Sequence, residues 1–276
     1  MKTDNQIFNF AKKIIDYPRS LSGNGVRKTL NNIKEILPQI KIKNFKSGER
    51  VFDWKIPLEW NVKDAYIVKP NGEKICEYSK NKLHLVGYSI PTNKTLSKNQ
   101  LLKKLHSLPN LKNAIPYVTS YYKKDWGFCL KHKDKLKLKE GNYKIFINSK
   151  HKKGVLNYGE ILIKGRSKKE ILFSTYICHP EMANNETSGI SVVTYLAKWI
   201  ASKKRNFSYR IIFIPETIGS IAYIKKNLKN LKKNLIAGFI VTCVGDKGNF
   251  SYIPSRSGNT LSDFVAKIIL KKNKKV

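Results

Sequence analysis

Residues 171–189 read ILFSTYICHPEMANNETSG, and this stretch decides the fold class. It opens with a nearly continuous apolar and β-branched run, the pattern of a strand buried on both faces of a parallel sheet. His179 follows the run, and a polar loop then carries Asn184, Asn185 and Glu186. A helix is expected next, because apolar residues recur at helical spacing from 192 to 200. Open α/β sheets keep their ligand sites at the carboxyl ends of strands, so the sequence predicts a site here.

Beyond residue 158 the sequence alternates between strand and helix patterns. Two more buried strands are predicted over residues 209–215 and 235–243, with a helix from about 218 to 228 between them. Such alternation implies parallel strands joined by right-handed crossovers. Glu216 follows the second strand as His179 follows the first, so both side chains are expected at one edge of the sheet. Asp246, after the third strand, is a further candidate carboxylate at that edge.

The first 150 residues have a different pattern of apolar and polar residues. Two amphipathic helices are predicted, one ending before Pro18 and one over residues 26–37. Residues 41–150 have β-rich patterning, including a strand-like run at 83–88, and one helix that begins at Ser97. The aromatic stretch 114–128 is either ordinary core packing or the wall of a binding cleft, and in the second case Tyr121 and Tyr122 would bind substrate.

Composition limits the class of protein. A chain of 276 residues has room for one large domain, or for a core domain with a smaller one. No apolar run is long enough to span a membrane, so no membrane partner is expected. The start of the chain lacks the pattern of a signal peptide. The cysteines are well separated and form no CxxC pair, which predicts free thiols and a cytoplasmic location.

The formal net charge of +35, from 54 basic and 19 acidic residues, is extreme. A field of that strength attracts polyanions. The lysines are spread through every segment, however, and there is no RNA-binding or helix-turn-helix signature. We therefore expect no specific nucleic-acid partner, only weak adhesion that salt removes.

Several long motifs, in order along the chain, resemble an uncharacterised prokaryotic aminopeptidase-like family. The motifs are RSLSGNGVRKTL (19–30), VFDWKIPLEWNVKDAYI (51–67), IPYVTSYYKKDWGFC (115–129), STYICHPEMANNETSG (174–189), FIPETIGSIAYI (213–224) and VTCVGD (241–246). The family looks like a divergent branch of the zinc aminopeptidase and carboxypeptidase superfamily. Its members are typically longer and often accompany surface-polysaccharide biosynthesis genes, so this chain resembles one that is incomplete at the C-terminus.

The resemblance implies an α/β fold: a zinc-exopeptidase-like core with a parallel-rich sheet flanked by helices, plus an inserted β-rich subdomain. The implied organisation is N-terminal core helices over residues 1–45, the inserted subdomain over 46–150 and the α/β core over 151–276.

The superfamily's usual site holds two zinc ions that share a bridging carboxylate. By resemblance, His179 matches a zinc ligand and Glu216 matches the general base. Asn184 falls at the bridging position, while Thr217 and Thr242 stand where further acidic ligands are expected. These neutral residues mean that the usual two-zinc site is not reproduced.

A site with a single zinc ion is the remaining metal hypothesis. His179 and Glu186 would supply two ligands, and a third would come from a more C-terminal part of such a protein. Glu186 has an alternative role as a carboxylate at a helix N-terminus, and His179 as a structural histidine. Asn184 and Asn185 are assigned to substrate binding.

The expected function is a metal-dependent hydrolase of an amide or peptide bond, and the resemblance implies a role in surface-polysaccharide metabolism. The alternative is an inactive relative that keeps the fold for binding or structure. The expected partner is a small peptide-like or amide-bearing substrate. The sequence is compatible with either a monomer or a homo-oligomer.

Overall fold

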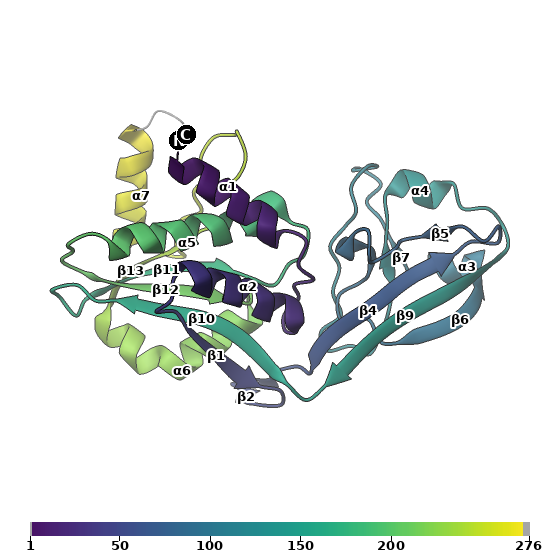
Figure 1. Ribbon diagram of the computed structural model, residues 1–276, viewed down its shortest axis with the longest axis horizontal. Helices are drawn as coiled ribbons and strands as arrows, with labels where there is room; N and C mark the ends of the chain where they lie inside the picture. The colour runs from purple at the N-terminus through teal and green to yellow at the C-terminus, as the bar shows by residue number, and fades with distance from the viewer. Residues whose placement is uncertain (1, 273–276) are drawn as a thin grey trace.

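The computed structural model describes residues 2–272 and has two lobes (Figure 1). One lobe is a five-stranded sheet with helices on both faces, and the other is built around a four-stranded antiparallel sheet. Among residues 2–272, no helix combines the length and the apolar character needed to cross a bilayer.

The core sheet contains the predicted parallel strands. Its order is β1 (Lys41–Lys46), β10 (Val155–Ile163), β12 (Ser208–Ile214), β11 (Glu170–Tyr176) and β13 (Leu235–Ile240). β11 pairs in parallel with both β12 and β13, which confirms the expected crossover topology. β10 and β1 extend the sheet in antiparallel pairing, so the sheet is wider than its parallel part.

Helices cover both faces of this sheet (Figure 1). α1 (Lys2–Ile14), α2 (Asn24–Ile36) and α5 (Ser188–Ala201) lie on one face, and α6 (Ile218–Asn234) lies on the other. Successive residues of β12 explain the layering, because side chains alternate across a strand. Ile211 and Phe213 join the cluster under α1, α2 and α5, while Ile212 and Ile214 join the cluster that includes α6. α7 (Leu261–Lys272) packs beside β13.

The β-rich lobe is organised by two long strands. β4 (Glu59–Val68) pairs with β9 (Asn142–Lys152), and β5 (Lys74–Ile75) and β6 (Thr92–Ser97) flank them. The smaller elements are β2 (Arg50–Val51), β3 (Trp54–Lys55), η1 (Lys82–His84), α3 (Lys98–Leu102), β7 (Leu105–His106), β8 (Phe128–Cys129) and α4 (His132–Leu136). The helix expected at Ser97 is confirmed, with a capping box between Ser97 and Gln100.

The strand expected at residues 83–88 is wrong. The 3-10 turn η1 ends at His84, and Leu85 and Gly87 make only isolated β-bridges, to Phe128 and Thr119. At the start of η1 the side chain of Asn81 accepts a hydrogen bond from the backbone N–H of Leu83. A local bond of this kind gives the backbone an alternative to a sheet ladder.

The two lobes share part of their interior. One apolar cluster contains Trp60 and Tyr88 of the β-rich lobe together with Ile212 and Tyr223 of the core. The predicted domain limits at 45/46 and 150/151 stay a prediction.

Candidate functional site

The three parallel strands end at one rim of the core sheet. His179 follows β11, Glu216 follows β12 and Thr242 follows β13. Nε2 of His179 lies 2.9 Å from Oε2 of Glu216, so the structure brings together the two residues that the sequence places at a common edge. The Glu216 side chain is paired with His179 and is 49% exposed, so solvent reaches its carboxylate.

Each of the three loops at this rim has a strained residue. Glu181, Thr217 and Cys243 have φ angles of 58°, 54° and 53°. These values lie in the left-handed backbone region that residues other than glycine rarely adopt. Strained backbone of this kind tends to cluster at functional sites, where the surrounding structure holds it in place. The pattern supports a site at the rim independently of the side-chain chemistry.

His179 is buried and oriented by its neighbours. Its Nδ1 lies 3.2 Å from Oδ1 of Asn185 and 3.3 Å from Oε2 of Glu186. Acceptors face both ring nitrogens, Asn185 and Glu186 at Nδ1 and Glu216 at Nε2, so the geometry favours a proton on each nitrogen, and a metal ion at Nε2 would take the place of the proton there. Burial lowers the pKa of His179, and the charge of Glu216 opposes that shift. The edge of the ring also contacts Tyr117, with ring centroids 4.6 Å apart.

Glu186 is held by several donors at once. Its Oε2 accepts the backbone N–H groups of Cys178 and His179, both at 2.7 Å, and its Oε1 accepts Nε of Arg19 at 2.8 Å. Neither Arg19 nor Glu186 has any exposed side-chain surface. Burial raises the pKa of Glu186, and Arg19 and the two backbone amides oppose the shift.

Arg19 extends this anchor to two further segments. Its guanidinium donates to the backbone oxygens of His179 and Ile14 and to Oγ1 of Thr187. The Arg19–Glu186 pair therefore fastens the loop that carries His179 to the N-terminal helices. The turn at residues 19–25, between α1 and α2, therefore contributes a central residue of the site's support.

Three residues at the rim carry side chains of the types that bind zinc. Cys178, His179 and Glu186 place one potential ligand atom each within 4.8 Å of one another. Burial raises the pKa of the Cys178 thiol well above its ordinary value, and its Sγ accepts the backbone N–H of Glu216. The donors on Glu186 compete directly with a metal ion for its carboxylate. Nε2 of His179 and the carboxylate of Glu216 are thus the atoms left to hold a metal ion. Because a catalytic zinc ordinarily has three protein ligands, these described residues supply part of a site for one ion and do not supply a site for two.

The two asparagines of the loop have different places. Asn185 lies beside His179, within the π-helical turn η2 (Ala183–Thr187), a conformation often found at functional sites. Asn184, which the resemblance puts at the bridging position, instead bonds the backbone N–H of Gly245 at 2.7 Å and Oδ2 of Asp246 at 2.5 Å. Asn184 therefore joins the loops after β11 and β13, and it is Asn185 that contacts the histidine.

Of the two tyrosines assigned to substrate, one lies near His179. Tyr122 is 61% exposed and its hydroxyl donates to the carbonyl of Lys55, away from the rim. The hydroxyl of Tyr121 lies 3.3 Å from that of Tyr117, the residue that contacts His179. Sequence reasoning missed Tyr117. Its only signal is membership of the aromatic stretch, which does not single it out.

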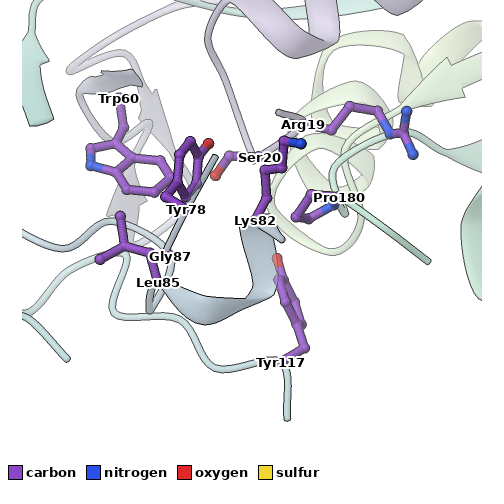
Figure 2. Close-up of a pocket in the computed structure, with 9 residues that line it drawn as sticks. All are labelled: Arg19, Ser20, Trp60, Tyr78, Lys82, Leu85, Gly87, Tyr117 and Pro180. Atoms are coloured by element: carbon purple, nitrogen blue, oxygen red, sulfur yellow. The ribbon is translucent and has the colours of Figure 1, made fainter. Parts of the chain in front are cut away.

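A small cavity of ≈ 10 Å³ lies between the lobes, next to this site (Figure 2). Pro180, which follows His179, and Tyr117, which touches it, both line the cavity. The other lining residues are Arg19, Ser20, Trp60, Tyr78, Lys82, Leu85 and Gly87. Both lobes thus contribute to its wall.

Comparison with known proteins places the fold in the class of zinc aminopeptidases. The structure matches a zinc aminopeptidase from Bacillus subtilis with a TM-score of 0.67 at 14% identity, covering 99% of this chain and 77% of that one. A peptidase M28 precursor from Shewanella amazonensis gives 0.65 at 11% identity, over 99% of this chain and 78% of that one. The chain itself belongs to the family described as "Domain of unknown function (DUF4910)", whose model matches residues 8–276.

Relatives from Clostridium acetobutylicum are much more similar in sequence. A protein named "Putative polysaccharide biosynthesis protein with aminopeptidase-like domain" is 41% identical over 269 residues, or 98% of this chain. The crystal structure of a "putative peptidase" from that organism matches with a TM-score of 0.92 at 41% identity, over 96% of this chain. This chain spans 62% and 63% of the lengths of these two proteins.

Proposed function

We propose that the protein is a metal-dependent hydrolase of an amide or peptide bond, in which His179 holds zinc and Glu216 accepts the proton of the attacking water. The observation that carries the proposal is the 2.9 Å approach of His179 Nε2 to Glu216 Oε2 at the shared rim of parallel strands. A proton on Nε2 makes this contact an ordinary ion pair, and zinc bound to Nε2 would take that proton's place beside Glu216.

Zinc in such a site would polarise the substrate carbonyl and make water more acidic. Glu216 is exposed enough to meet a water molecule and a substrate, as a general base must be. Asn185 fixes the orientation of the His179 ring, and Tyr117 shields one side of it. Glu186 orders the loop through Arg19 and the two backbone amides, which is the kind of support that ligands need from the residues behind them.

The substrate class is a small peptide-like or amide-bearing molecule. The name of the C. acetobutylicum relative supports a role in polysaccharide biosynthesis. The four cysteines are all free thiols, which supports a reducing compartment such as the cytoplasm.

A second candidate is a binding protein that keeps the fold without the chemistry. The carboxylate of Glu186 is already engaged by Arg19, and Asn184, Thr217 and Thr242 are neutral where the superfamily has acidic residues. A site with so few anionic groups attracts divalent cations weakly.

Metal analysis and hydrolysis assays separate the two candidates. Purified protein dialysed against zinc should retain close to one ion per chain and release product from aminoacyl amides. His179→Ala should lose both, and Glu216→Gln should lose hydrolysis while keeping at least part of the zinc. His84→Ala and Glu140→Gln, both in the β-rich lobe, are the matched controls and should behave as wild type. Absence of zinc and of hydrolysis in the wild type would favour the binding protein.

A further inference from the structure

The cavity between the lobes is lined by polar groups whose hydrogen-bonding capacity is not used. Ser20 and Tyr78 are buried as residues, and within residues 2–272 neither hydroxyl makes a hydrogen bond to another protein group, because each hydroxyl oxygen borders open space. The ammonium of Lys82 pairs with Glu181 at 3.2 Å, and the Tyr117 hydroxyl has a long 3.3 Å contact to Tyr121. Among residues 2–272, Asn32 Oδ1 is the one fully buried side-chain polar atom without a hydrogen bond, so the hydroxyls of Ser20 and Tyr78 remain open to a water molecule or a ligand atom in the cavity.

These groups are donors at neutral pH. Burial raises the pKa values of Tyr78 and Tyr117 above the ordinary value for a tyrosine, so both keep their protons. Arg19 borders the cavity, but its guanidinium points away from it (Figure 2) and is engaged by Glu186. Lys82 is therefore the charged donor available to the cavity. A small space with hydroxyl donors and one ammonium favours an oxygen acceptor that carries negative charge.

The cavity and the proposed reaction site share part of their walls. Tyr117 contacts the ring of His179, and Pro180 is the next residue along the chain. The volume of ≈ 10 Å³ is room for about one water-sized group, so an oxygen of a larger molecule fits and a bulky side chain does not.

We propose that this cavity is a carboxylate subsite, in which Lys82, Tyr78 and Ser20 bind one carboxylate oxygen of the substrate. The proposal rests on the proposed function and narrows its substrate class. The amide that is cleaved then carries a carboxylate a few bonds from the scissile carbonyl, as in an N-acylated amino acid or a dipeptide. Within that class, a neutral analogue without the carboxylate leaves the ammonium of Lys82 paired with Glu181 alone.

The test is a pair of calorimetric titrations of the full chain after removal of metal with a chelator, so that zinc cannot bind the carboxylate. N-acetylglycine should bind at least about tenfold more tightly than N-acetylglycinamide, because a hydrogen bond to a charged group is worth more than one to a neutral group. Equal affinities, or binding of neither compound, would show that the cavity holds only water.

Single substitutions test whether the cavity residues cause the preference for N-acetylglycine over N-acetylglycinamide. Lys82→Met should abolish the preference for N-acetylglycine, and Tyr78→Phe, which keeps the ring, should reduce it several-fold. Glu181→Gln is the matched control, since it also breaks the Lys82–Glu181 ion pair but leaves the ammonium in place. It should keep or strengthen the preference. If Glu181→Gln loses the preference as Lys82→Met does, the ion pair between the lobes explains the result and the subsite is wrong.

The two proposals fail separately. A carboxylate preference in a protein that takes up no zinc and hydrolyses no amide would overturn the enzyme and keep the subsite. Zinc uptake and hydrolysis without any preference for the carboxylate would overturn the subsite and keep the enzyme.

Discussion

Replacing Arg19 with methionine tests the anchor beneath the candidate site. Arg19 and Glu186 are fully buried, and their ion pair at 2.8 Å joins residues 167 apart in the chain. Removing the guanidinium leaves the Glu186 carboxylate buried with two backbone N–H groups and Nδ1 of His179 at 3.3 Å, and it also removes a donor from the carbonyl of His179. Breaking one side of a buried pair typically costs about 3–5 kcal/mol. Since a domain is stable by about 5–15 kcal/mol, this is a large share.

The assay is urea unfolding followed by circular dichroism, with the single variants Arg19→Met and Glu186→Gln and the double variant. Each single change should lower the free energy of unfolding by several kcal/mol. The double variant should lose about 2–4 kcal/mol less than the sum, because no unpaired charge remains. Lys13→Met, which breaks an exposed ion pair with Glu35, is the control and should cost less than about 1 kcal/mol. Additive losses from Arg19→Met and Glu186→Gln would refute the reasoning.

Three further predictions concern stability. Arg27 lowers the pKa of Glu59 from an ordinary 4.5 to about 2, so this carboxylate stabilises the fold fully above pH 4.5 and progressively less as pH falls towards 2. Glu59→Gln should cost about 1–2 kcal/mol at pH 7, allowing for solvent screening, with a difference from wild type that shrinks over that window in urea titrations. Thr217→Gly, which relieves φ 54° and ψ −80°, should raise stability by about 1 kcal/mol, and a loss would show that the conformation is not strained. Gly189→Ala should cost about 1–3 kcal/mol, because a Cβ there would lie 2.5 Å from a backbone oxygen; an unchanged melting temperature would contradict this.

Much of the core fold could be predicted because its signals are local. The apolar runs that became β11 and β12 alternate with helical patterns, and that order implies parallel strands ending at one rim. The same logic placed His179 near Glu216. Periodicity did not reveal that β1 and β10 complete the sheet, since antiparallel additions from distant segments leave no mark on the pattern of either strand.

The finer features of the site depend on contacts between distant segments. Glu186 is equally compatible in sequence with a metal ligand and with a structural anchor, and only the position of Arg19 distinguishes the two. Tyr117 lies beside His179 because the β-rich lobe folds against the core, which no spacing in the sequence encodes. Asn184 and Asn185 are neighbours with different contacts, and the π-helical turn that contains both and directs their side chains to different partners cannot be recognised in the sequence.

The central claim is that His179 binds zinc and that Glu216, beside it, is the general base. Anomalous diffraction at the zinc edge, from crystals of the protein grown with zinc, tests it most directly. We predict a single peak about 2.0–2.1 Å from Nε2 of His179, next to Glu216 and absent in His179→Ala. A peak elsewhere in the chain, or none at this rim when zinc is in excess, would contradict the account.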